Sequence, residues 1–212
     1  DAAGRVAGAE LAGRGVEALG PVAEGANGVV VSIVGPDGER TMASDRGVSP
    51  ELSPEELDEA WFDGCDWLHV SGYALARMPI AEAAAAAAAL ARARGARVSV
   101  DLSAWTVIRE TGARHFRERI EGLEPALVFA NEAEWEMVGG AYALADTAIV
   151  KRGRRGVAVV GGGRSEEYEP STADVVDTTG AGDALAAGFL VGGIELGLEA
   201  AARCVGKLGA MP

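Results

Sequence analysis

A seven-residue run late in the chain, Asp177-Thr-Thr-Gly-Ala-Gly-Asp183, combines glycines and carboxylates in a pattern suited to phosphate chemistry. A predicted helix follows it, and the first turn of a helix offers unpaired backbone N–H donors and a partial positive charge. The segment Gly180–Gly182 permits a sharp turn that points these donors at one spot, which predicts an anion site. Asp183 lies in the same turn, where its carboxylate can accept a proton from an attacking hydroxyl. The alternative is a glycine turn followed by a helix-capping aspartate.

Alternating strands and helices precede this motif. The pattern predicts an α/β fold with a mostly parallel sheet and helices on both faces. Ligands of such sheets bind outside the carboxyl ends of the strands, which is where Gly72, Asp101, Asn131 and Asp177 fall. The predicted strands are Trp67–Ser71, Val98–Leu102, Leu127–Ala130, Ala148–Lys151 and Val157–Val160. The predicted helices are 54–62, Pro79–Arg94, Arg109–Gly122, Glu132–Val138, Ala184–Leu190 and Leu198–Leu208.

The first fifty residues differ from this pattern. Residues 6–19 predict a helix interrupted by glycines, and residues 28–43 predict a β-hairpin. The hairpin signal is a β-branched run, a Gly35-Pro-Asp-Gly38 turn and a second short strand. An ordinary surface hairpin is the alternative to a functional one.

Composition limits the classes of function. The net charge of −13 over 212 residues argues against a nucleic-acid or anionic-membrane partner, because both need a basic surface. Cys65 and Cys204 form no zinc-type spacing with the two histidines. The alanine run 83–89 lies in an amphipathic helix flanked by charges, and no signal peptide is visible. These features predict a single domain over residues 1–212 and a cytoplasmic protein.

The string DTTGAGDALAAGFL at 177–190 resembles the C-terminal consensus of the ribokinase/PfkB family of sugar and nucleoside kinases. The resemblance implies a three-layer α/β sandwich with a mostly parallel central sheet, to which residues 28–43 add part of a small β lid. It also implies ATP and Mg²⁺ as cofactors, Asp183 as the catalytic base, and an anion hole formed by the amides of Gly180, Ala181 and Gly182. Asp177 and Thr178 would organise the phosphate region, where many members also bind a monovalent cation such as K⁺.

Further segments match the family in order along the chain. Asn131-Glu-Ala-Glu134 resembles its N-x-x-E element, which implies that Asn131 and Glu134 help to place Mg²⁺ and the phosphates, partly through water. On its own, such a sequence is a helix cap with an exposed glutamate. The 150–157 segment resembles the strand-turn-strand beside the nucleotide, which assigns Lys151, Gly153 and Gly156 to ATP. A solvated basic turn is the alternative for Arg154 and Arg155. Tyr73 follows a strand near the expected substrate mouth.

The chain departs from the family at its beginning. It starts at Asp1 without the early strand and the Gly-Gly…Asn segment that bind the sugar in family members, so we expect an N-terminally incomplete domain. Three functions stay open: a sugar or sugar-acid kinase, a nucleoside kinase, and an inactive remnant that binds ligand or dimerises. The nucleoside kinase ranks below the sugar kinase because only 5% of residues are aromatic and the hairpin has none. Family members often form homodimers through the lid.

Overall fold

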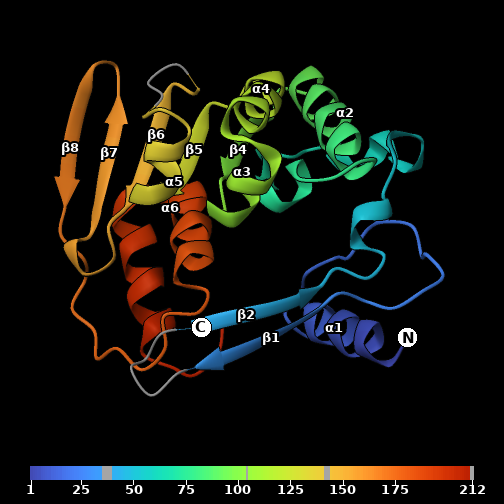
Figure 1. The fold of residues 1–212 in the computed structure, drawn as a ribbon, viewed down its shortest axis with the longest axis horizontal. Helices are drawn as coiled ribbons and strands as arrows, with labels where there is room; N and C mark the ends of the chain where they lie inside the picture. The colour runs from blue at the N-terminus through green and yellow to red at the C-terminus, as the bar shows by residue number, and fades with distance from the viewer. Residues whose placement is uncertain (35–39, 104, 141–143, 211–212) are drawn as a thin grey trace.

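The structure is a computed structural model that describes residues 1–34, 40–103, 105–140 and 144–210. Its centre is a six-stranded sheet with strand order β3-β4-β5-β6-β7-β8 (Figure 1). The first four strands run parallel, whereas β7 and β8 are antiparallel to their neighbours. The strands are β3 (Trp67–Ser71), β4 (Arg97–Asp101), β5 (Leu127–Asn131), β6 (Thr147–Lys151), β7 (Val157–Gly161) and β8 (Arg164–Tyr168).

Helices cover both faces of this sheet. Consecutive side chains of a strand point to opposite faces, and β5 shows the result. Its Val128 and Ala130 join one apolar core with four helices, while Leu127 and Phe129 join another with helix α6. The helices are α2 (Ile80–Ala93), α3 (Trp105–Thr111), α4 (Ala113–Leu123) and α5 (Glu132–Met137) on the first face and α6 (Ala181–Val205) on the second. The predicted three-layer α/β sandwich with a mostly parallel sheet is therefore confirmed.

A separate two-stranded sheet is formed by β1 (Val29–Val34) and β2 (Arg40–Asp45), which pair antiparallel. Figure 1 shows it lying apart from the large sheet, on the side to which the parallel strands run, next to helix α1 (Ala2–Gly13). The predicted hairpin strands are confirmed, and the turn predicted at 35–38 lies outside the described residues. Apolar side chains of this small sheet are exposed, namely Val29, Val30, Val31, Ile33 and Met42.

Several predicted helices differ in the structure. The stretch 54–62 forms two 3₁₀ turns, Pro54–Glu56 and Glu59–Phe62, instead of one α-helix. The helix predicted over 109–122 is divided into α3 and α4, because Gly112 adopts a positive φ of 85° between them. Further 3₁₀ turns are Ser49–Glu51, Gly72–Leu75 and Gly153–Arg155.

Helix α6 joins the two helices predicted late in the chain. Gly192 and Gly193 leave helical geometry at its middle, so it consists of two helical pieces with a kink between them. By length and hydropathy alone α6 is the one helix among the described residues that could span a membrane. In this fold its inner face packs on the sheet through Leu185 and Ala186.

Candidate active site

The glycine turn lies at the head of α6. Gly180 is the helix N-cap with φ 79°, and a Cβ on it would lie 2.4 Å from the Ala210 carbonyl oxygen, so this position requires glycine. Among the described residues, the amides of Gly182 and Asp183 have no protein acceptor. The Ala181 amide, in contrast, donates to the Thr178 carbonyl at 3.3 Å. Of the three amides predicted from the sequence, those of Gly180 and Gly182 have no acceptor among the described residues, whereas the Ala181 amide is engaged.

The side chain of Asp177 holds this loop together. One carboxylate oxygen accepts from the Thr179 amide at 2.9 Å and from the Thr179 hydroxyl at 2.7 Å. The other accepts from the Gly209 amide at 3.0 Å. Asp177 thus fixes the loop entering α6 to the segment leaving it, and both its oxygens are engaged in doing so.

A cavity of about 550 Å³ opens beside the turn. Its volume lies in the range of small-molecule sites. Six residues predicted from the sequence line it: Lys151, Gly153, Gly156, Thr178, Ala181 and Gly182. Apolar side chains of α6 and of residues 170–175 form most of its remaining wall. The predicted residues Asp177, Asp183 and Asn131 do not line it.

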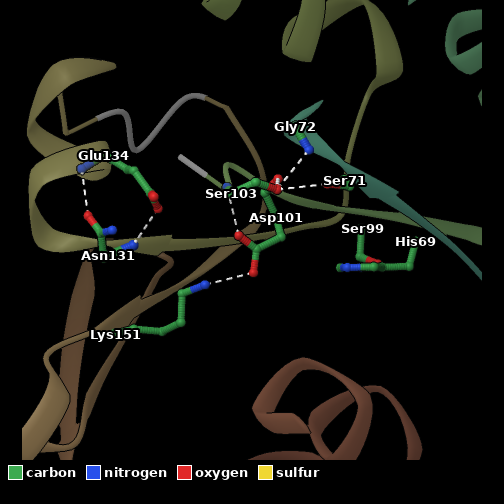
Figure 2. Close-up of polar contacts among 9 residues, drawn as sticks. All are labelled: His69, Ser71, Gly72, Ser99, Asp101, Ser103, Asn131, Glu134 and Lys151. Carbon is green, nitrogen blue, oxygen red and sulfur yellow. Dashed lines mark hydrogen bonds and ion pairs between the residues drawn. The ribbon is translucent and has the colours of Figure 1, made fainter. Parts of the chain in front are cut away.

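Lys151 is held at the edge of this cavity by an ion pair that the sequence analysis did not predict. Its ammonium lies 2.7 Å from an Asp101 carboxylate oxygen, and both side chains are largely buried, at 20% and 7% exposed (Figure 2). A Cβ built on Gly182 would lie 3.3 Å from the same ammonium nitrogen. The cation therefore lies directly beside the glycine turn.

Asn131 and Glu134, the residues predicted for Mg²⁺, cap helix α5 reciprocally. The Asn131 side chain accepts from the Glu134 amide at 2.9 Å, and the Glu134 carboxylate accepts from the Asn131 amide at 2.8 Å (Figure 2). Glu134 is only 2% exposed, unlike the exposed glutamate of an ordinary cap, and burial raises its pKa. Within the described ranges, no group of three or more His, Cys, Asp or Glu side chains could hold a metal ion.

Two more side chains belong to β3 and to the turn that follows it. His69 of β3 contacts the Ser99 hydroxyl at 2.9 Å, and desolvation lowers its pKa against the opposing effects of Asp101 and Asp183. The His69 side chain is nevertheless exposed at the surface of the chain. Tyr73, the predicted substrate residue, lines a smaller cavity of about 130 Å³, where the Arg46 guanidinium lies 3.9 Å from its ring centroid.

Comparison with known proteins identifies the family to which this chain belongs. Residues 1–211 match the model of the pfkB family carbohydrate kinases. The chain belongs to the pfkB family. An ATP-dependent ribose-1-phosphate kinase of Halopiger xanaduensis is 33% identical over 210 residues, which are 92% of this chain and 66% of that protein. The chain thus spans just under two thirds of the length of this curated pfkB relative.

Solved structures agree with the pfkB assignment. Adenosine kinase from Sinorhizobium meliloti has a TM-score of 0.90 and 27% identity, covering 100% of this chain and 71% of that one. A probable sugar kinase from Rhizobium etli CFN 42 has a TM-score of 0.90 and 25% identity, with the same coverages. The pfkB relatives with this fold therefore include proteins named for both sugar and nucleoside substrates.

Proposed function

We propose that the protein is an ATP-dependent kinase that transfers the γ-phosphoryl group to a hydroxyl of a sugar or sugar acid. The observation that carries the proposal is the glycine turn at the head of α6, with a cation beside it and a cavity of about 550 Å³ next to both. Membership of the pfkB family supports the same chemistry.

Each part of the site would have its own task. The nucleotide would occupy the cavity beside Gly153 and Gly156, with its phosphates toward Gly182 and Lys151. Free amides at a helix N-terminus and a fixed ammonium would stabilise the charge that develops on the transferred group. Asp183 would accept the proton of the attacking hydroxyl; it is exposed, as a base that meets a second substrate must be.

Magnesium would arrive with ATP and neutralise phosphate charge when bound. The reciprocal cap already occupies the Asn131 oxygen and one Glu134 oxygen, and Glu134 is almost fully buried. These residues therefore fit a role through bridging water, which Mg²⁺ retains readily. The K⁺ site expected near Asp177 stays a prediction. Both Asp177 carboxylate oxygens accept protein hydrogen bonds in this structure.

The small sheet β1–β2 would serve as the lid over the acceptor, and Tyr73 would lie at the substrate mouth. A two-stranded sheet is marginally stable alone, and burying its exposed valines against another surface would stabilise it. A homodimer formed through the lid would supply that surface. Light scattering on the purified protein tests for this homodimer. If it forms, Val31→Glu, which places a charge on the small sheet, should shift the measured mass from dimer to monomer.

The substrate class distinguishes the sugar kinase from the nucleoside kinase. The relatives carry names of both kinds, a ribose-1-phosphate kinase and a cytidine kinase among them. An ADP-release assay across sugars, sugar phosphates, sugar acids and nucleosides, run beside an ATP-binding titration, decides between them. Turnover of a sugar-type acceptor supports the proposal, and turnover of nucleosides alone supports the second candidate. Nucleotide binding without turnover on any acceptor favours an inactive remnant.

A further inference from the structure

The ion pair between Asp101 and Lys151 joins two strands that are not neighbours. Asp101 ends β4 and Lys151 ends β6, with β5 between them in the sheet. Figure 2 shows the two side chains reaching toward each other across the sheet edge. Asp101 is only 5% exposed. Burying a carboxylate costs several kcal/mol unless it is paired, so its position depends on the partners that it keeps.

The second oxygen of Asp101 is also engaged. It accepts from the Ser103 amide at 2.8 Å, and Ser103 adopts φ 69°, which is uncommon for a residue with a side chain. The Ser103 hydroxyl donates to the Asp101 carbonyl at 3.0 Å and accepts from the Gly72 amide at 3.0 Å. Its one proton is thereby used, so the Ser71 hydroxyl donates to it at 2.9 Å. One oxygen of the Asp101 carboxylate is therefore fixed by Ser103, and the other is paired with the Lys151 ammonium.

The position of Lys151 relative to the glycine turn indicates a function for the fixed Asp101 carboxylate. A flexible lysine usually points its ammonium into water, yet here the nitrogen lies beneath Gly182 at the rim of the cavity. We propose that Asp101 is a positioning residue that holds the Lys151 ammonium beside the Gly182 amide, where the phosphates of a nucleotide would meet a preset cation. The role in catalysis rests on the proposed function, whereas the restraint on Lys151 does not.

The restraint can be measured without activity, because the chain has just two lysines, Lys151 and the exposed Lys207. Amine acylation followed by mass spectrometry of peptides reports each one separately. We expect Lys151 to react roughly tenfold more slowly than Lys207, and Asp101→Asn to remove most of that difference. Asp63→Asn is the matched control, because it breaks an exposed pair with Arg94 instead. An unchanged Lys151 rate in Asp101→Asn overturns the proposal.

Nucleotide binding then tests whether the restraint serves the site. Asp101→Asn and Lys151→Met should each weaken ATP binding by about tenfold, and the double variant should be no weaker than Lys151→Met alone. A merely structural Asp101 would give additive losses, accompanied by a lower melting temperature, and that result contradicts the proposal. If Lys151 is restrained but ATP does not protect it from acylation, the proposed function fails while the restraint stands.

Discussion

Alanine substitutions at Gly180 and Gly182 should have opposite effects on stability, although the two residues are neighbours in one turn. At Gly180 the φ of 79° strains any side chain by roughly 1–3 kcal/mol. A Cβ there would also lie 2.4 Å from the Ala210 carbonyl oxygen, so backbone must move. At Gly182 the φ is ordinary for a helix, and alanine should stabilise the fold by about 0.5–1 kcal/mol. The two variants should therefore differ by roughly 2–4 kcal/mol.

Urea denaturation measures this difference. With a slope of about 2 kcal/mol per molar urea, the midpoints should be separated by roughly 1–2 M. In Gly182→Ala, ATP binding should weaken although the stability of the fold increases. The new methyl would lie 3.3 Å from the Lys151 nitrogen at the cavity rim, and should weaken ATP binding on the order of tenfold despite the gain in stability. A stable Gly180→Ala variant, or unchanged ATP affinity in Gly182→Ala, would contradict this prediction.

Three further substitutions test the surroundings of the site. Burial raises the pKa of Glu134 above its usual 4.5, so the stability of the folded state falls as the pH rises from 4.5 through the raised pKa. Glu134→Gln should therefore gain stability relative to wild type as the pH rises above 4.5, whereas the exposed control Glu136→Gln should not, and equal pH profiles would contradict this. Asp177→Ala removes the acceptor of three hydrogen bonds and should cost about 1–3 kcal/mol of unfolding free energy by denaturant titration. Gly72→Ala should lower the unfolding free energy by at least about 2 kcal/mol, because its Cβ would lie 2.5 Å from the Leu102 carbonyl oxygen. Gly122→Ala, with open space around it, should instead stabilise helix α4. Similar melting temperatures for the two variants would contradict this prediction.

The sheet was predictable from sequence because its strands have strong local signals. Buried β-branched runs bounded by glycine or polar residues gave β3 to β7 within about a residue. Strand β8 was missed, since Arg164–Tyr168 is polar and exposed and pairs only as an edge. The helix break at Gly112 and the 3₁₀ turns after Ser53 depend on backbone geometry and packing that local composition does not encode.

The candidate site was predictable where the chemistry is local in sequence. The glycine turn is one short string, and the resemblance supplied the lining residues Lys151, Gly153 and Thr178. The Asp101–Lys151 pair spans fifty residues and two strand positions, so no spacing rule reveals it. The buried state of Glu134 was missed for the same reason, because neighbouring elements bury it while its own sequence suggests an exposed cap.

The proposed role of Asp183 is tested most directly by the change Asp183→Asn, which keeps the shape of the side chain and removes its ability to accept a proton. The turnover number for the best acceptor found and the dissociation constant of ATP should be measured on the same preparations. We predict a fall in turnover of about a hundredfold or more, with ATP affinity within about threefold of wild type. Turnover that survives the substitution, or turnover and ATP binding lost together, would contradict the role of Asp183 as the base at this turn.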